Sequence, residues 1–193
     1  AHLATKTNKI HMTTKNKKGF TIIEVVLVLA IAGLIFLMVF IALPALQRSQ
    51  RNTQRENDLS RFLTAANDYQ TNNSGKTPFG TDGTTFDEKF VKRYIDDTCA
   101  AKVTQAMENP GCAESSSQFR DPDGTPYQFV LKGKVTANND NANGGETALS
   151  HKIYVYVNAS CGDENQALKG TGNRQYALFY TLEGGAVTCN DNH

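Results

Sequence analysis

The chain opens with a polar, lysine-rich segment and then enters one long apolar run. From Phe20 to Leu43, only Thr21 and Glu24 carry side chains that resist a hydrocarbon environment. Such a run can cross a bilayer as a helix, and at about 1.5 Å per residue it would span roughly 36 Å. We therefore expect a transmembrane helix over residues 20–43.

A second pattern continues this helix. Pro44 removes one backbone donor, which predicts a kink rather than an end, because apolar residues resume at helical spacing. They form one apolar stripe with polar residues opposite it: Leu59, Phe62, Leu63, Ala66 and Tyr69. The turn sequence 72–75 ends the pattern. We expect one helix from Phe20 to Asn72, in which the amphipathic second half, residues 44–74, packs on a globular head.

The head, residues 75–193, shows shorter elements. Thr85-Phe86-Asp87-Glu88 is a capping box that predicts a short helix from about Phe86 to Ile95. Segments rich in β-branched and aromatic residues predict strands at 127–131, 152–157, 175–181 and 186–189. Consecutive strands without intervening helices favour an antiparallel meander. We therefore expect an α+β fold with the long helix packed on a small antiparallel sheet of about four strands.

Charge adds an orientation to this arrangement. Residues 1–19 hold five lysines and no acid, so removing them from a chain of net charge +1 leaves about −4. Positive residues stay in the cytoplasm, which places residues 1–19 inside and the head outside. Arg48, Arg51 and Arg55 on the far side weaken this contrast. We expect these arginines to contact lipid head groups or other subunits beside the membrane.

Glu24 is the one acid in the apolar run. A carboxylate in a membrane helix costs about 2.5 to 3.5 kcal/mol at mid-membrane by insertion scales, and it is kept where a partner neutralises it. Cleavage after Gly19 would create a positive amino group on Phe20, which can pair with Glu24 in the same or a neighbouring subunit. Glu24 therefore predicts a cation supplied by a new chain terminus.

The segment Lys17-Lys18-Gly19-Phe20-Thr21-Ile22-Ile23-Glu24-Val25-Val26 resembles the class III signal of type IV pilins and of the pseudopilins of type II secretion and DNA-uptake machines. The resemblance implies a cytoplasmic leader of residues 1–19, cleavage between Gly19 and Phe20 by a membrane-embedded prepilin peptidase, and N-methylation of Phe20. It further implies assembly into a helical filament by an inner-membrane platform and ATPase motors. In that filament Glu24 pairs with the N-terminal amine of an adjacent subunit.

Alternatives to this interpretation remain at the N-terminus. One is a signal anchor that contains a single acid, and another is a secretory signal peptide, although its cleavage site would follow a shorter apolar region. Met12 is a candidate start that would give a leader of eight residues, and the first eleven residues would then be upstream translation or a cloning remnant.

The long helix matches this family at its glycine position and departs from it at its proline position. Gly33 occupies the family's glycine position, the fourteenth of the mature chain, where the helix can loosen during assembly. A close-packing point between membrane helices is the alternative role for Gly33. The family's usual proline position is Ile41 here, and the proline lies three residues later, at Pro44. This departure leaves open where the helix would bend in a filament.

All four cysteines lie beyond the membrane segment, and their spacing matches no CxxC metal pattern: Cys99, Cys112, Cys161 and Cys189. In an exported head they predict two disulfides, for which three connectivities are possible. We favour Cys99 with Cys112 and Cys161 with Cys189, because each pair closes a short local loop. Unpaired buried thiols in a reducing compartment are the alternative.

The segment Asp121-Pro122-Asp123-Gly124-Thr125-Pro126-Tyr127 is a turn sequence, since Pro restricts φ and Gly supplies a positive φ. It also resembles the Asp-Pro-x-Gly-x-Pro-Tyr segment that precedes the first strand in major pseudopilins and several pilins. The resemblance implies that this turn locks the loop leading into the sheet.

One segment of the head offers oxygen ligands for calcium, Asn139–Glu146. An EF-hand register from Asn139 would need an acid where Ser150 stands. We therefore expect a solvated hairpin loop between the first two strands, and no cofactor, with calcium as the alternative. Asp121 and Asp123 are ambiguous in the same way.

Catalytic chemistry is not expected. Of the four histidines, His2 and His11 lie in the leader, His193 is the last residue, and His151 lies in the head beside a strand. The sequence predicts neither a catalytic triad nor a phosphate-binding loop, and its slightly acidic mature chain does not favour direct nucleic-acid binding.

These features predict a single-pass protein of the cytoplasmic membrane that moves into an extracellular type IV pilus for adhesion, twitching motility or cell contact. The alternatives are a pseudopilin of a type II secretion or DNA-uptake apparatus, or a membrane-anchored exported domain that does not polymerise.

Overall fold

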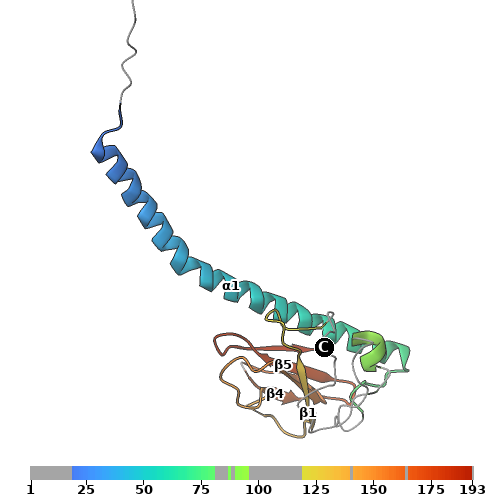
Figure 1. Ribbon diagram of the computed structural model, residues 1–193. Helices are drawn as coiled ribbons and strands as arrows, with labels where there is room; N and C mark the ends of the chain where they lie inside the picture. Colours follow the sequence, from blue (N-terminus) through green and yellow to red (C-terminus); the bar gives the residue numbers. More distant parts are fainter. Residues whose placement is uncertain are drawn as a thin grey trace, which may run out of the picture. The chain divides into compact units, whose positions relative to one another are not determined.

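The longest element is the helix α1, Ile22–Asn72. The computed structural model describes residues 19–80, 87, 90–95, 119–139, 141–163 and 165–192. The chain divides into two units, Ala1–Pro44 and Ala45–His193, and α1 contributes to both (Figure 1). Pro44 lies inside the helix, so the prediction that the helix continues beyond it is confirmed.

Both ends of α1 have a local cause. The helix begins two residues later than predicted, because Thr21 adopts a non-helical conformation and caps it. At the other end, Ser74 and Gly75 adopt φ values of 54° and 79°, which break the helical path. The Gly75 N–H donates to the carbonyl of Gln70 at 2.8 Å, as expected for the predicted turn.

In the first unit, the apolar side chains of α1 are exposed. Ile22 is 85% exposed and Phe40 is 74% exposed. By length and composition α1 can cross a membrane. Exposed apolar side chains over so many turns require an apolar environment, such as lipid or other helices, that the described part of the chain does not supply.

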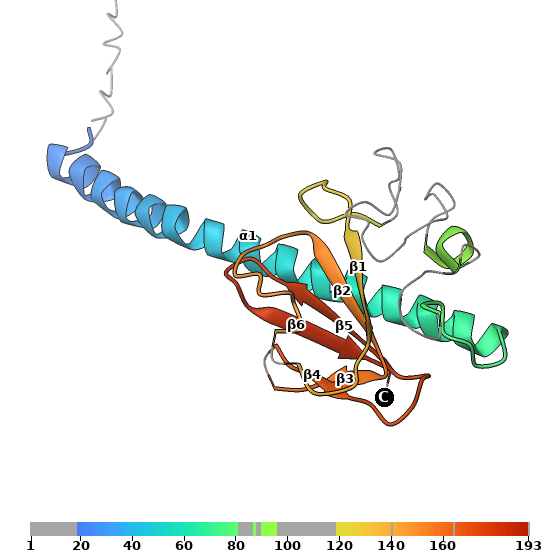
Figure 2. The same ribbon diagram turned by 90° about the horizontal axis from the view of Figure 1, so that it is seen from below.

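In the second unit, the described strands form two sheets. The strands are β1 (Gln128–Lys134), β2 (Lys152–Val157), β3 (Ala159–Cys161), β4 (Ala167–Lys169), β5 (Tyr176–Thr181) and β6 (Val187–Asp191). Four of them form one sheet in the order β1-β2-β5-β6, and β3 pairs with β4 in a separate sheet (Figure 2). The four predicted strands are present, whereas the β3–β4 pair was not predicted.

Only the end of the predicted short helix is described. It is the π-helix η1 (Val91–Ile95). Thr85, Phe86 and Glu88 of the predicted capping box lie outside the described residues.

The main sheet is mixed, and this corrects one prediction. β1 runs parallel to β2, with Gln128 opposite Lys152, whereas the β2–β5 and β5–β6 pairs are antiparallel. The predicted antiparallel meander is therefore wrong for the first pair, and residues 135–151 form a crossover rather than a hairpin loop. A parallel pair needs a connection of about a dozen residues or more, which this segment supplies. The α+β fold class is confirmed.

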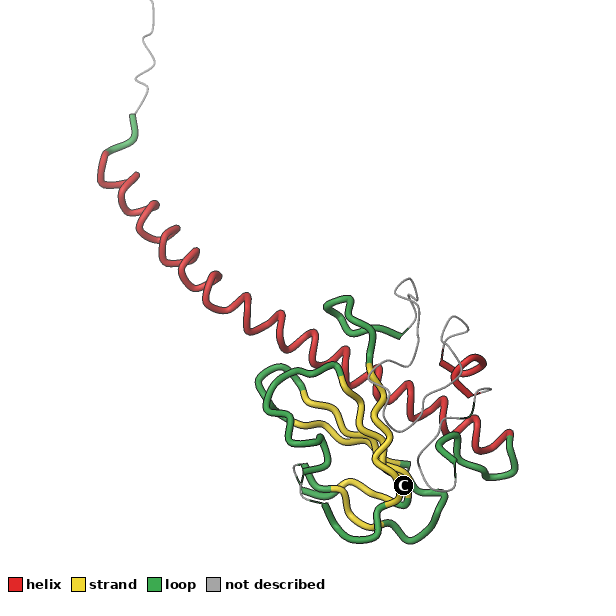
Figure 3. Tube along the Cα trace, turned by 60° about the horizontal axis from the view of Figure 1, so that its bottom comes forward, coloured by secondary structure: helices red, strands yellow, loops and turns green. Residues whose placement is uncertain are grey.

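The core lies between α1 and one face of the sheet. The second half of α1 runs along the sheet (Figure 3). Its buried residues Leu59, Phe62, Ala66 and Tyr69 pack against side chains from alternate positions of β1, β2 and β5. The opposite face of the sheet is also covered, by the crossover and the β3–β4 pair, through a second buried cluster that includes Tyr154 and Phe179. The central strands are thus buried on both faces, which holds the second unit together.

Candidate functional site

The predicted cleavage site lies immediately before the helix. Gly19, Phe20 and Thr21 are exposed and precede the first helical residue. The Thr21 N–H and the Thr21 hydroxyl each donate to Oε2 of Glu24 at 2.8 Å. In return, the Glu24 N–H donates to the Thr21 hydroxyl oxygen at 3.3 Å. This reciprocal pair is a capping box.

The capping box gives Glu24 a local partner that the sequence analysis missed. The signal was present as the spacing of Thr21 and Glu24, a threonine followed three residues later by a glutamate. The Thr21 N–H is a peptide amide both before and after a cut between Gly19 and Phe20, so these contacts do not depend on cleavage. Both Thr21 donors use Oε2, which leaves Oε1 without a hydrogen bond among the described residues.

Gly33 lies on the exposed helix of the first unit. A Cβ atom added there would have no atom within 4 Å other than its chain neighbours and the backbone of the adjoining helical turns. Crowding within the single chain therefore does not explain why glycine stands at this position. The two predicted roles of Gly33, loosening the helix during assembly or allowing close packing between membrane helices, stay predictions. Pro44 is the last residue of the first unit.

In the second unit, one buried arginine of α1 organises the polar contacts of the head. Arg55 is 1% exposed, and its Nε and Nη2 donate to Oδ2 and Oδ1 of Asp121 at 2.6 and 2.7 Å. Its Nη1 donates to Glu183 at 2.8 Å and to Asn52 at 3.0 Å. Burial lowers the pKa of the guanidinium, but the hydrogen bonds to the two carboxylates outweigh burial and raise that pKa above its usual value.

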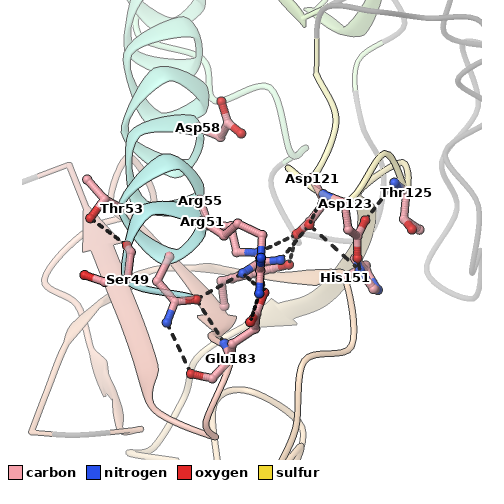
Figure 4. A network of polar contacts seen from close by, with 12 residues as sticks. Ser49, Arg51, Thr53, Arg55, Asp58, Asp121, Asp123, Thr125, His151 and Glu183 are labelled. Carbon is pink, nitrogen blue, oxygen red and sulfur yellow. Dashed lines mark hydrogen bonds and ion pairs between the residues drawn. The ribbon is translucent and has the colours of Figure 1, made fainter. Parts of the chain in front are cut away.

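Glu183 belongs to the turn between β5 and β6 and joins a second arginine to this network. Arg51 donates through Nε and Nη2 to the two carboxylate oxygens of Glu183, both at 2.7 Å (Figure 4). These hydrogen bonds, together with those from Arg55, lower the pKa of Glu183 to about 2. Asn52 completes the contact, since its side-chain oxygen accepts the Glu183 N–H at 3.1 Å. The turn is thereby fixed against α1.

The predicted turn at residues 121–127 is the second segment fixed against α1. Asp121 is 2% exposed and accepts the Tyr180 hydroxyl as well as Arg55. The Tyr127 hydroxyl donates to Asp58 of α1 at 2.9 Å. Burial raises the pKa of Asp58, although this hydrogen bond opposes the rise. The turn therefore meets the helix at two points one helical turn apart, Arg55 and Asp58.

Three potential metal ligands lie close together beside the turn at residues 121–127. Oxygen or nitrogen atoms of Asp121, Asp123 and His151 lie within 4.8 Å of one another. However, Oδ1 of Asp121 accepts from Arg55 and from the Asp123 N–H, and Oδ2 accepts from Arg55 and Tyr180. Because each carboxylate oxygen has about two acceptor sites, Asp121 has none to offer a cation. The group is better described as an ion-pair network than as a metal centre.

The exposed part of this network is the pair of Asp123 and His151. Their side chains approach to 2.6 Å between Oδ2 and Nε2. Burial raises the pKa of Asp123, but the Thr125 N–H and His151 outweigh burial and lower that pKa to about 2. His151 therefore pairs with a carboxylate of the turn.

The candidate calcium loop is held by its own side chains. Asn143 is 1% exposed and donates to the carbonyl of Glu146 at 2.6 Å and to the hydroxyl of Thr181 at 2.9 Å. Its side-chain oxygen accepts from Asn165 and from the Gly145 N–H. The Glu146 carboxylate accepts from Lys152 and Tyr154. The side-chain oxygens of Asn143 and Glu146, two of the ligands considered for the alternative of calcium binding, therefore help to fold the crossover. Asp140 lies outside the described residues.

One of the two predicted disulfides is described. Cys161 of β3 and Cys189 of β6 are bonded, with Cα atoms 5.9 Å apart, so this favoured pairing is confirmed. The bond ties the edge strand of the main sheet to the smaller sheet. The other predicted pair, Cys99 and Cys112, lies outside the described residues.

Comparison with known proteins identifies the N-terminal segment. Residues 14–40 match the family model described as the prokaryotic N-terminal methylation motif. This motif is the class III prepilin signal typical of type IV pilins and pseudopilins, and the match includes Gly19, Phe20, Glu24 and Gly33. No curated protein and no solved structure matched the chain.

With this motif and its α+β head, the chain is similar to type IV pilin-like prepilins. The motif implies processing by prepilin peptidase and assembly into a filament. Proteins of this kind are generally structural subunits without enzymatic activity.

Proposed function

We propose that this chain is a structural subunit of a type IV pilus, cleaved between Gly19 and Phe20, methylated on Phe20 and assembled into a surface filament. The supporting observation is the combination of the matched motif with an apolar helix whose large side chains stay exposed from Phe20 to Leu46. Lipid can cover these side chains before assembly, and the helices of like subunits can cover them afterwards. The filament would serve adhesion, twitching motility or cell contact.

Burial of this helix drives the proposed assembly. Membrane helices leave the bilayer and bundle in the filament core, where contacts with other helices replace contacts with lipid. A head-to-tail interface that does not close on itself produces an open helical fibre, as required for a pilus.

Glu24 supplies the register in this assembly. Its carboxylate is oriented by Thr21 through Oε2, and Oε1 remains for the amine of a processed Phe20 in an adjacent subunit. In the low-dielectric filament core, such a charge pair is strong only when its geometry is good, so one register is preferred over the others. A helix that already carries an oriented carboxylate loses less conformational freedom on pairing.

The head is suited to a position outside the membrane. The Cys161–Cys189 disulfide requires an oxidising compartment to form and persist. The contacts of Arg55 with Asp121 and Glu183 hold the sheet on the second half of α1. Because the head is fixed to the second half of α1, the first half of the helix can pack against other subunits while the head stays folded.

A pseudopilin of a type II secretion or DNA-uptake apparatus is the second candidate function. The observation that favours it is the segment 121–127, which resembles the Asp-Pro-x-Gly-x-Pro-Tyr segment of major pseudopilins and is tied to α1 through Asp121. A subunit of that kind would form a short assembly in the cell envelope rather than a long surface fibre.

Mass spectrometry of membrane and sheared-surface fractions tests the proposal. We expect a mature chain that starts at methylated Phe20 and is recovered from sheared fibres. A processed chain that stays with the cell envelope would favour the pseudopilin. A chain that keeps residues 1–19 in every fraction would contradict both functions and leave a membrane-anchored domain.

A further inference from the structure

The basic residues that follow the membrane segment are not equivalent in the structure. Arg51 and Arg55 are both bound by Glu183, and Arg55 is also bound by Asp121. Arg48 is exposed, and within the described part of the chain its side chain makes no hydrogen bond or ion pair. Of the three arginines beside the predicted membrane boundary, Arg48 is therefore the one whose charge is available.

Arg48 also lines a depression in the second unit. This depression has a volume of about 460 Å³, and the segment Thr147–Leu149, Glu183 and the turn at Gly184–Gly185 form the rest of its lining. The two glycines adopt φ values of 96° and 86° and present main chain without side chains. The one acid in the lining, Glu183, is neutralised by the arginines that bind it, so Arg48 sets the local charge.

The position of Arg48 along α1 suggests what occupies this depression. Arg48 follows Pro44 by four residues, roughly 6 Å along the helix, and it is the first charged residue after Glu24. Leu46, two residues earlier, is still 59% exposed and apolar. A guanidinium at the end of an apolar helix lies at the depth of lipid head groups, and its fork of N–H donors matches the geometry of a phosphate.

We propose that Arg48 and the depression beside Gly184–Gly185 bind the phosphate group of an anionic membrane lipid on the outer side of the cytoplasmic membrane. Charge complementarity and continuity with the apolar helix both favour a lipid as the occupant. The contact holds the subunit at a defined height before assembly, and it must be given up when the helix leaves the bilayer. The inference rests on the membrane insertion of residues 20–43, and it does not rest on filament formation.

The test uses the full chain in detergent micelles, titrated with dioleoyl phosphatidylglycerol or dioleoyl phosphatidylcholine, with bound lipid counted by native mass spectrometry. We expect tighter binding of phosphatidylglycerol, and we expect Arg48→Gln to weaken it about fivefold, the effect of one basic residue near an anionic surface. Arg61→Gln, which removes the same charge from an exposed position of the same helix, is the matched control and should leave the preference unchanged.

Several results would overturn the inference. Equal losses in the two variants would show a general charge effect, and an unchanged preference in Arg48→Gln would remove the site. Inorganic phosphate that displaces the lipid at millimolar concentration would identify a phosphate site rather than a lipid site. If Arg48→Gln binds lipid normally but yields fewer sheared fibres, the partner of Arg48 is a neighbouring subunit.

The insertion step is measured separately, by flotation of the full chain with phosphatidylglycerol vesicles. A chain that floats without a preference for the anionic lipid contradicts this inference alone. A chain that does not float contradicts the membrane insertion on which both this inference and the pilus proposal depend.

Discussion

Arg55 and Asp121 form a two-point ion pair between α1 and the turn that precedes β1. Both donor–acceptor distances are below 3 Å, at 2.6 and 2.7 Å, and neither side chain is exposed to solvent. The pair joins residues that are 66 positions apart in the chain. It therefore couples the long helix to the turn that leads into the sheet, beside the buried side chain of Tyr127.

We predict that Arg55→Met destabilises the head by about 3 to 5 kcal/mol, because it leaves the Asp121 carboxylate buried without its cation. Chemical denaturation of the full chain in detergent, followed by circular dichroism, measures the change. Arg48→Met is the matched control, since Arg48 is exposed on the same helix and makes no hydrogen bond or ion pair within the described part of the chain. A double variant with Asp121→Leu should lose less than the sum of the single variants. Strict additivity would show that the two residues do not act as a pair.

The Cys161–Cys189 disulfide should contribute about 3 to 4 kcal/mol, because it closes a loop with a sequence separation of 28 and so restricts the unfolded chain. Replacing both residues by serine should lower the free energy of unfolding by this amount, measured by the same denaturation. The double variant avoids a free thiol that could exchange with other cysteines. A loss below about 1 kcal/mol would mean that the chain-entropy account does not apply here.

Acid should weaken the contact between α1 and the β5–β6 turn. The pKa of Glu183 is lowered to about 2 in the folded chain, below the usual value of about 4.3 for an unfolded glutamate. As pH falls, the unfolded state therefore binds protons first, and the stability that Glu183 contributes near neutral pH is lost between about pH 4.5 and 2.

We expect Glu183→Gln to be less stable than the parent at pH 7 and to lose less stability over this acid window. Thermal unfolding followed at intervals of pH measures both effects. Glu56→Gln, at an exposed position of α1, is the control and should keep the slope of the parent. If Glu183→Gln kept that slope too, the acid sensitivity would come from other carboxylates, of which Asp123 is the first to examine.

Glu24→Ala should leave membrane insertion and cleavage intact but reduce the yield of sheared fibres at least about tenfold, since a loss of only 1.4 kcal/mol at each interface is sufficient. Immunoblots of sheared and membrane fractions measure this yield. Thr21→Val, which removes the hydroxyl contact but keeps the N–H donor to Glu24, should reduce assembly less. Normal polymerisation of Glu24→Ala would show that the carboxylate does not set the register.

Gly19→Leu should block cleavage, because a bulky side chain would replace the glycine at the exposed segment before α1. The intact mass of the membrane-bound chain should then include residues 1–19. Gly33→Leu is a useful comparison, since it adds the same bulk within the helix rather than before it and should leave cleavage unchanged. A normally trimmed Gly19→Leu chain would contradict the proposed cleavage site.

The amino-acid sequence alone determined the features that depend on short-range pattern. The matched motif around Gly19, Phe20 and Glu24 and the continuous helix to Asn72 are local properties, since helical periodicity and turn residues act over a few positions. The four main strands were predicted for the same reason. The capping contact of Thr21 with Glu24 is equally local. It was not predicted because Glu24 was considered as a charge that needs a cation and not as a hydrogen-bond acceptor at the start of the helix.

Only the tertiary structure decided the features that join distant parts of the chain. The parallel direction of β1 and β2 depends on how residues 135–151 cross the sheet, which side-chain alternation does not encode. Arg55 belongs to the same helical stripe as Leu59, but a charged residue can be buried only where a distant partner neutralises it. That partner is Asp121, and a pattern of polar and apolar positions carries no information about which distant residues will meet.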